Sequence, residues 1–330
     1  MKQIRFWLNN ARTTALPQST LPSILAFCMA STQAGFSVWS GILAIIGVAL
    51  GHLGMNLFDD YFDYKKKDSS FRDSMAREGF RARISKCTYL TSGEATVRQL
   101  FIACLTFCGL AFAIGVVIFL LRGPFILYIA LITAILGISY SGDPLRISYR
   151  GFGELLIGFM FGPLLMTGVY YSACGQFDIS LLFISIPVGL LVVNILYVHS
   201  IMDLEPDKKV GKITLAVLLE YKKAILAALW LILFGPYLII LTGIIMYDMP
   251  ISYLFTLLTL PMACALFYLM VQYVKDPTKS FTPKFWMGPM GRWEYIKQAG
   301  IDWFMIRWYL ARNLLTFFCL IVIIIHFVNS

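Results

Sequence analysis

Long apolar stretches recur along almost the whole chain and constrain its fold more than any other feature. A helix needs about 20 apolar residues to cross a hydrocarbon core about 30 Å thick. Nine stretches of roughly that length are present, at 17–35, 39–58, 97–121, 124–141, 152–173, 180–200, 222–246, 250–274 and 304–328. The first is the weakest, because Pro17 and Pro22 interrupt it. With 59% hydrophobic and 14% charged residues, the chain is predicted to be an all-α polytopic membrane protein.

Lysine and arginine are distributed unevenly around these stretches. With nine spans, one side of the membrane receives the amino terminus and the loops at 59–96, 142–151, 201–221 and 275–303. With the flanking helix ends, those segments contain every lysine and arginine except Arg122. Positively charged loops stay in the cytoplasm. We therefore expect a cytoplasmic amino terminus in a bacterial-type inner (cell) membrane, and we attribute most of the net charge of +9 to topology rather than to nucleic-acid binding.

A cleaved signal peptide is not expected, because the first apolar stretch has no compact core with a small-residue cleavage site. We expect a single domain covering 1–330. Within it, the segment 275–303 contains three prolines, three tryptophans and several lysines. That composition is typical of a segment that lies on the membrane surface, and it also suits a lid over a cavity.

Two acidic motifs follow apolar runs. The first is the segment 56–68, NLFDDYFDYKKKD, in which Asn56, Asp60 and Asp63 share one face if the preceding helix continues. In the second, DLEPD at 203–207, Asp203 and Asp207 lie one helical turn apart. Lysines follow both motifs. Oxygen ligands of this kind suit hard divalent cations that also bind phosphate, so we predict a polyphosphate site at cytoplasmic helix ends around a central cavity.

A third polar stretch, 140–154, reads YSGDPLRISYRGFGE. Gly142 and Pro144 end the fourth span, and Arg146 and Arg150 project from the short connection. Glu154 then faces back into a span, and intramembrane carboxylates usually have a partner or a function. Two interpretations stay open, a pairing of Glu154 with an arginine and a role in the site.

At these motifs the chain closely resembles the UbiA superfamily of intramembrane aromatic prenyltransferases. That family has a first motif of the type NDxxDxxxD after its second helix and a DxxxD motif after its sixth. The nearest branch is that of the 1,4-dihydroxy-2-naphthoate polyprenyltransferases of menaquinone biosynthesis. Three further stretches resemble this branch: PLRxxYRGxGE within 140–154, FGPL with a tyrosine pair within 161–171, and GKxTLAV at 211–217. The resemblance runs from about residue 12 to about residue 219.

Three positions depart from the family pattern. Asp59 stands where the family usually has asparagine, and the last acid of the first motif comes at Asp68, with Lys67 intervening. His199 and Ser200 replace the polar pair of Asn or Asp type ahead of the second motif. The carboxylates of Asp60, Asp63, Asp203 and Asp207 are retained. These departures therefore affect the identity of the aromatic acceptor rather than the metal site.

The resemblance implies Mg²⁺-dependent transfer of a polyprenyl group from a polyprenyl diphosphate to an aromatic acceptor, with loss of the acceptor's carboxylate. The implied metal ligands are Asn56, Asp60, Asp63, Asp68, Asp203 and Asp207. The residues expected to bind substrate or to neutralise the diphosphate are Arg12, Asn56, Arg77, Ser141, Arg146, Arg150 and Lys212. The rings expected to shield the allylic carbon by cation–π attraction are Tyr140, Phe58, Tyr61 and Phe62.

Two alternatives remain at this point. One is a prenyltransferase of the same family with another acceptor, such as 4-hydroxybenzoate, homogentisate or a lipid alcohol. The other is a membrane transporter of an anionic substrate, because charged helix ends that face a cavity also occur in transporters. The acids lie at helix ends rather than in the middle of spans, and this placement favours an enzyme that takes its diphosphate from the cytoplasm.

Overall fold

The computed structural model describes residues 2–65, 87–209 and 211–329. Helices and their connections make up these residues, and no strand is assigned among them. The helices form two compact units. Unit 1 comprises Met1–Tyr149 and Leu164–Asp178, and unit 2 comprises Arg150–Pro163 and Ile179–Ser330. The expectation of a single domain over 1–330 stays a prediction.

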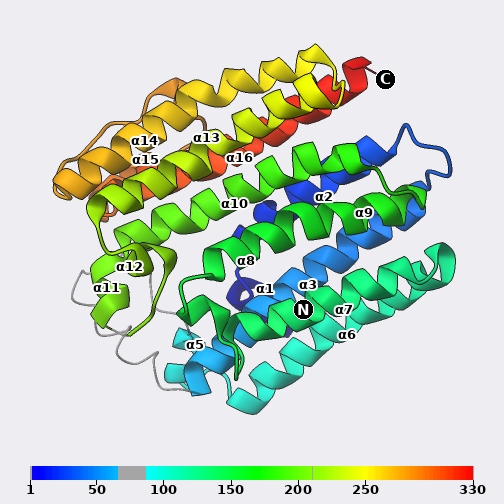
Figure 1. The fold of residues 1–330 in the computed structure, drawn as a ribbon. Coiled ribbons are helices and arrows are strands. Elements are labelled where there is room, and N and C mark those ends of the chain that lie inside the picture. Colours follow the sequence, from blue (N-terminus) through cyan, green and yellow to red (C-terminus); the bar gives the residue numbers. More distant parts are fainter. Residues whose placement is uncertain (1, 66–86, 210, 330) are drawn as a thin grey trace. The chain divides into compact units, whose positions relative to one another are not determined.

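Unit 1 is built around α3, the 28-residue helix Val38–Lys65 that carries the first acidic motif. Helices α2, α6, α7 and α9 pack against α3, and α6 and α7 run beside it in Figure 1. The other elements of this unit are α1 (Lys2–Asn10), η1 (Thr13–Ala15), α2 (Pro17–Ala30), α5 (Thr88–Thr91), α6 (Val97–Arg122), α7 (Phe125–Ser141), η2 (Ile147–Tyr149) and α9 (Leu165–Cys174).

The ends of the unit 1 helices are joined by hydrogen bonds. At the carboxyl end of α3, Asn56 Nδ2 donates to the carbonyl of Ala11, which precedes α2. At the opposite end, Arg122 closes α6 by donating to the carbonyls of Gly35, between α2 and α3, and Ala173, in α9, at 3.0 and 2.6 Å. The backbone N–H of Ser37 also donates to the Ala173 carbonyl at 2.8 Å. Because loop carbonyls need donors, these bonds fix which helix ends meet.

Unit 2 is built around α10 (Leu182–Met202), which carries the second acidic motif at its end and packs against α8, α13 and α16. Figure 1 shows α13, α14 and α16 running together in this unit. The remaining elements are α8 (Gly153–Phe159), the π-turn η3 (Met160–Leu164), η4 (Ile179–Leu181), α11 (Leu204–Lys209), α12 (Leu215–Leu219), α13 (Lys222–Met246), η5 (Ile251–Thr259), α14 (Leu260–Lys275), η6 (Phe285–Met287), α15 (Trp293–Gln298) and α16 (Asp302–Asn329).

Glycines bring α8 and η3 close to α10. A Cβ added at Gly162 would lie 2.6 Å from the Cα of Gly189 and would also meet the carbonyl of Ser185. A Cβ at Gly158 would lie 2.9 Å from the Gly189 carbonyl. Small residues that allow such backbone contact are typical of helix pairs in membranes, where packing rather than hydrophobic burial joins the helices.

The segment between α14 and α16 is attached to α16. Asn313 donates from Nδ2 to the carbonyls of Met287 and Pro289, at 2.9 Å each. Met287 is buried, whereas Phe285 is 96% exposed. This pattern fits a segment with one anchored face and one open face, and its role as an interfacial segment or a lid stays a prediction.

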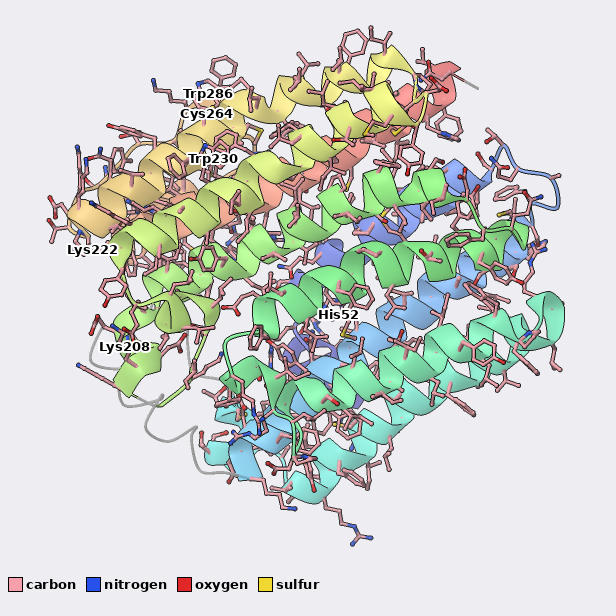
Figure 2. All side chains as sticks on the ribbon, viewed as in Figure 1. His52, Lys208, Lys222, Trp230, Cys264 and Trp286 are labelled. Carbon is pink, nitrogen blue, oxygen red and sulfur yellow. The ribbon has the colours of Figure 1, made fainter. Side chains whose placement is uncertain are left out.

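Seven helices of the described residues are long and apolar enough to cross a membrane, and they include the composite helices Gly153–Cys174, Ile179–Met202 and Ile251–Lys275. Large apolar side chains are exposed on them: Trp230 of α13, labelled in Figure 2, is 45% exposed, and Leu231 is 61% exposed. The protein is therefore an integral membrane protein. The expected spans at 17–35 and 124–141 correspond to the shorter helices α2, of 14 residues, and α7, of 17 residues. The full count of nine is thus not confirmed by helix length.

Candidate active site

The carboxyl end of α3 gathers the first acidic motif within unit 1. The helix continues through the motif to Lys65, so Asn56, Asp60 and Asp63 follow each other on consecutive turns of one helix. Asp60 and Asp63 are buried. Two carboxylates are thus held inside the protein where an apolar helix ends.

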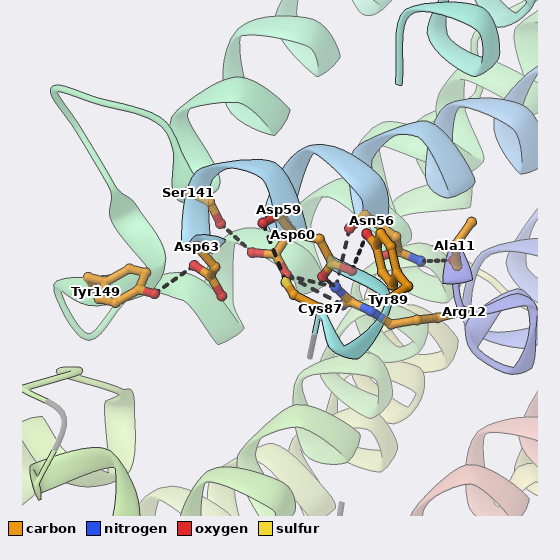
Figure 3. A network of polar contacts seen from close by, with 10 residues as sticks. All are labelled: Ala11, Arg12, Asn56, Asp59, Asp60, Asp63, Cys87, Tyr89, Ser141 and Tyr149. Atoms are coloured by element: carbon orange, nitrogen blue, oxygen red, sulfur yellow. Dashed lines mark hydrogen bonds and ion pairs between the residues drawn. The ribbon is translucent and has the colours of Figure 1, made fainter. Parts of the chain in front are cut away.

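Arg12 supplies the positive charge next to these carboxylates. Its guanidinium forms an ion pair with Asp60, lies 3.3 Å from Asp59 Oδ2, and donates to the carbonyl of Asn56 at 3.2 Å (Figure 3). Burial of Arg12 opposes its protonation, but the charges of Asp60 and Asp59 outweigh burial and raise the pKa of Arg12. The guanidinium therefore stays charged and neutralises part of the cluster.

Hydroxyl groups from three other segments donate to the same carboxylates (Figure 3). Ser141, the last residue of α7, donates to Asp59 Oδ1 at 2.6 Å, and Tyr149 donates to Asp63 Oδ1 at 2.6 Å. Tyr89 of α5 donates to Asp60 Oδ2 at 3.1 Å. Burial and the charge of Asp60 raise the pKa of Tyr89, so its hydroxyl keeps the proton that it donates.

The network includes several of the expected residues and two that the sequence analysis missed. Asn56, Asp60, Arg12 and Ser141 lie in this network, and their roles as substrate or metal ligands stay predictions. Tyr149 lies within the polar stretch 140–154, but no residue spacing indicates that this tyrosine will reach a carboxylate 86 residues earlier. Tyr89 had no sequence signal at all.

The remaining expected residues of unit 1 lie beside the network. The guanidinium of Arg146 stacks 4.0 Å from the centre of the Tyr149 ring. Tyr140 is half-buried, next to Ser141 near the end of α7. Asp68 and Arg77 lie outside the described residues.

The aromatic residues of the first motif form a separate cluster between α3 and α6. Phe58 and Phe62 stack with ring centres 6.1 Å apart, and Phe101 of α6 contacts Phe58 and Tyr61 at 6.3 and 5.4 Å. Packing against other aromatic rings therefore explains many of the contacts that Phe58, Tyr61 and Phe62 make.

In unit 2, the second motif begins where α10 ends. Asp203 is the residue that caps α10, and the N–H of Asp207 donates to its carbonyl at 2.8 Å, so the two residues lie one turn apart as expected. Both side chains are 2% exposed. Nε2 of His199 lies 3.6 Å from Asp203 Oδ2. The backbone N–H of half-buried Lys212 donates to the carbonyl of Asp207 at 2.9 Å, which ties the expected diphosphate ligand to the motif.

Glu154 connects the second motif to the segment that follows it. Its carboxylate accepts from Ser200 Oγ at 2.6 Å and from the N–H of Leu215 at 3.2 Å. Gly151 N–H donates to the carbonyl of Ile213 at 2.8 Å, and exposed Arg150 pairs with Ile213 as an isolated parallel bridge. Among the described residues, the donors to Glu154 are therefore a serine and a backbone amide, not an arginine.

The oxygen donors of both motifs fit a hard divalent cation. No group of three or more His, Cys, Asp or Glu side chains within residues 2–65, 87–209 and 211–329 is gathered as a complete metal site. Mg²⁺ does not require one, because it commonly binds one or two carboxylates and completes its shell with water and substrate phosphates. The buried aspartates are of the right chemical type for such sharing.

Comparison with known proteins identifies the family. The profile of the UbiA prenyltransferase family matches residues 20–288. The chain belongs to the UbiA prenyltransferase family. As a family member, the protein is a prenyltransferase, and the acidic ends of α3 and α10 are its candidate active-site elements.

Curated UbiA relatives carry related names. A 1,4-dihydroxy-2-naphthoate octaprenyltransferase of Bacillus subtilis is 27% identical over 68% of this chain and 68% of its own length. An enzyme of the same name from Mycobacterium tuberculosis is 28% identical over 64% of this chain and 68% of its own length. A 2-carboxy-1,4-naphthoquinone phytyltransferase of Synechocystis is 33% identical, over 46% of this chain and 48% of the relative.

Solved UbiA structures share the fold. A digeranylgeranylglyceryl phosphate synthase aligns with a TM-score of 0.62 at 18% identity, over 99% of this chain and 98% of the other. A UbiA homologue from Archaeoglobus fulgidus, solved with GPP and Mg²⁺, aligns with a TM-score of 0.56 at 16% identity, over 94% and 99% of the two chains. At these identities the likeness concerns the fold alone.

Proposed function

We propose that this UbiA prenyltransferase transfers a polyprenyl group from a polyprenyl diphosphate to 1,4-dihydroxy-2-naphthoate, in menaquinone biosynthesis. The observation that carries the proposal is the carboxylate network at the end of α3, where Asp59, Asp60 and Asp63 each accept a hydroxyl hydrogen bond. The names of the curated relatives support the acceptor. Another acceptor of the family type is the alternative.

In the proposal, the residues of the first motif that would hold Mg²⁺ are Asp60 and Asp63, with Asn56 or Asp68. In the second motif, Asp203 and Asp207 would hold Mg²⁺. Bound Mg²⁺ supplies Lewis acidity that stabilises the negative charge developing on the departing diphosphate. The carboxylates of the first motif are kept in place by their hydroxyl donors, so little reorganisation would be needed there for an ion to bind.

The chain's own cations and aromatic rings carry the other tasks. Lys212, Arg146 and Arg77 neutralise the diphosphate, and Arg12, Arg150 and Ser141 contribute to substrate binding. The allylic C–O bond breaks with its electron pair on the diphosphate, and the ring carbon of the acceptor forms the new C–C bond. Carbon dioxide leaves the acceptor, and the electron pair of its bond restores the aromatic ring. Tyr140 shields the electron-poor allylic carbon by cation–π attraction of about 0.5–2 kcal/mol.

We further propose nine membrane spans, with the amino terminus and the loops that follow α3, α7, α10 and α14 in the cytoplasm. Two observations support this topology. The lysines and arginines concentrate in these segments. Within unit 1, the segment before α2 is bonded to α3 through Ala11 and Asn56, and the end of α7 is bonded to α3 through Ser141 and Asp59.

The test uses the purified protein with radiolabelled farnesyl or longer prenyl diphosphate, Mg²⁺ and a panel of acceptors that includes 4-hydroxybenzoate and homogentisate. We expect labelled product with 1,4-dihydroxy-2-naphthoate, and we expect EDTA to abolish it. Asp63→Asn and Asp203→Asn each remove a charge from one motif, and the rate should fall on the order of a hundredfold.

The matched control is Asp276→Asn, which alters an aspartate that is exposed and lies outside both motifs. This variant should keep the wild-type rate. Full activity of Asp63→Asn and Asp203→Asn would refute the metal assignment. If prenyl transfer occurs only to another acceptor, the assignment of 1,4-dihydroxy-2-naphthoate is wrong, and the assignment of the two motifs stays intact.

A further inference from the structure

The end of α10 is held from two helices that lie beyond the region of family-like motifs. The hydroxyl of Tyr273, in α14, donates to the carbonyl of Met202 at 3.0 Å. Met202 is the last residue of α10, and Asp203 follows it directly. The last carbonyls of a helix have no intrahelical donor, so a bond from another helix fixes both the carbonyl and the peptide that leads into the next residue.

Tyr273 is itself held firmly. Its ring stacks on Trp303, with centres 5.8 Å apart and planes inclined by 5°. The guanidinium of Arg307 lies 5.1 Å from the centre of the Tyr273 ring. Two neighbours from α16 thus restrict the ring, so the hydroxyl is presented to Met202 in one orientation.

Arg307 joins the two helices that carry this arrangement. It is fully buried, donates from Nε to the carbonyl of Leu269 in α14 at 3.1 Å, and donates from Nη1 to the carbonyl of Trp303 in α16. A buried guanidinium needs such acceptors, because an unsatisfied buried charge is costly. Arg307 therefore fixes α14 against the first turns of α16.

The first turns of α16 also contact His199, which lies beside the Asp203 carboxylate. The ring of Phe304 meets the imidazole of His199 edge to face, with centres 5.3 Å apart. His199 lies 3.6 Å from the Asp203 carboxylate through Nε2. Both the backbone before Asp203 and the imidazole beside its side chain are therefore positioned from α14 and α16.

We propose that Tyr273 is a positioning residue for the second acidic motif, holding the Met202 carbonyl so that the Asp203 carboxylate is oriented to bind the metal–diphosphate complex. Arg307 and Trp303 hold Tyr273 in turn. This proposal rests on the proposed function, because it assigns Asp203 to metal binding. Partners that orient a ligand without touching the metal change metal affinity about 10- to 100-fold when they are replaced.

The test is Tyr273→Phe, which removes one hydroxyl and leaves the stacked ring. Tyr268→Phe is the matched control, because Tyr268 lies on the same helix, is 52% exposed and has no hydroxyl hydrogen bond among the described residues. The first measurement is the shift of the unfolding midpoint that Mg²⁺ with inorganic pyrophosphate produces. The second is the Mg²⁺ concentration that gives half-maximal prenyl transfer.

For Tyr273→Phe we expect a smaller midpoint shift and a half-saturating Mg²⁺ concentration raised about tenfold, with kcat at saturating Mg²⁺ close to that of the wild type. Tyr268→Phe should match the wild type in both measurements. The proposal is overturned if Tyr273→Phe and Tyr268→Phe require the same Mg²⁺ concentration, or if Tyr273→Phe only lowers the unfolding midpoint of the ligand-free protein.

Asp203→Asn separates this proposal from the function on which it rests. If Asp203→Asn leaves the pyrophosphate-induced shift unchanged, the assignment of Asp203 to metal binding fails, and the role of Tyr273 fails with it. If Asp203→Asn abolishes the shift while Tyr273→Phe behaves like Tyr268→Phe, only the positioning role is wrong.

Discussion

Arg12 lies where a cation is needed when no metal ion is bound. Its guanidinium contacts Asp59 and Asp60, and its left-handed backbone, with φ of 60°, directs the side chain from the segment between α1 and η1. Removing the counter-charge of a buried carboxylate strongly destabilises the folded protein. Arg12 therefore compensates the charge of the first motif in the metal-free protein.

This role predicts opposite effects with and without metal. In EDTA, Arg12→Gln should lower the unfolding midpoint, because Asp59 and Asp60 lose their cation, at a cost of about 3–5 kcal/mol for a buried pair. Added Mg²⁺ should raise the midpoint of the variant more than that of the wild type, because the ion replaces the missing charge. Thermal unfolding of the purified protein in both buffers measures the two effects.

The control for Arg12 is Arg5→Gln, because Arg5 lies nearby in α1 and is exposed. It should leave the midpoint within about a degree of the wild type in either buffer, since exposed charges contribute little. Equal midpoints for Arg12→Gln and Arg5→Gln in EDTA would contradict the proposed charge compensation.

At the scale of single residues, the sequence predicts the carboxylates of the site but not the residues that donate hydrogen bonds to them. The spacing of Asp60 and Asp63 follows from helical periodicity alone, and the continuation of α3 to Lys65 confirms that they lie on one helix. Tyr89 and Tyr149 reach those acids through tertiary contacts between segments far apart in the chain. Such contacts depend on how helices pack, and no local pattern encodes them.

At the scale of elements, Glu154 links two of the family-like stretches, 140–154 and 211–217, through its hydrogen bonds. It lies in the first turn of α8, accepts from Ser200 near the end of α10, and accepts from Leu215 at the start of α12. One carboxylate thus orders the segment that contains Lys212. Of the two interpretations left open by the sequence, pairing with an arginine is not what the described residues show, and a supporting role near the site is favoured.

The close packing of η3 on α10 predicts the effect of a single methyl group. Gly162→Ala would place its Cβ 2.6 Å from the Cα of Gly189, so the helices must separate. Overpacking of this kind costs about 1–3 kcal/mol. We expect the unfolding midpoint of the variant, measured in detergent or nanodiscs, to fall by several degrees.

Gly115→Ala in α6 provides the comparison, since a Cβ there meets nothing within 4 Å. Alanine favours a helix over glycine by about 1 kcal/mol, so this variant should be as stable as the wild type or more stable. A Gly162→Ala midpoint at or above that of Gly115→Ala would show that the helices tolerate separation.

At the scale of the whole molecule, hydropathy predicted most of the helices and left the shortest ones ambiguous. Apolar runs merge the helix with its flanking turns, so the run at 17–35 extends beyond α2, which ends at Ala30. At about 1.5 Å per residue, α2 is about 21 Å long and α7 about 26 Å. Both are short for a hydrocarbon core of about 30 Å, and a bilayer accommodates such mismatch by local thinning.

Hydrogen bonds within unit 1 support the proposal that α7 crosses the membrane. It starts beyond Gly123, beside the Arg122 end of α6, and it ends with Ser141 bonded to Asp59. Reporter fusions at Gly123 and at Leu145 test this directly. Alkaline phosphatase, active only outside the cytoplasm, should be active at Gly123 and inactive at Leu145, and a fluorescent protein that folds only in the cytoplasm should give the reverse. Equal reporter activity at the two sites would mean that α7 does not cross, and the nine-span topology would then be wrong.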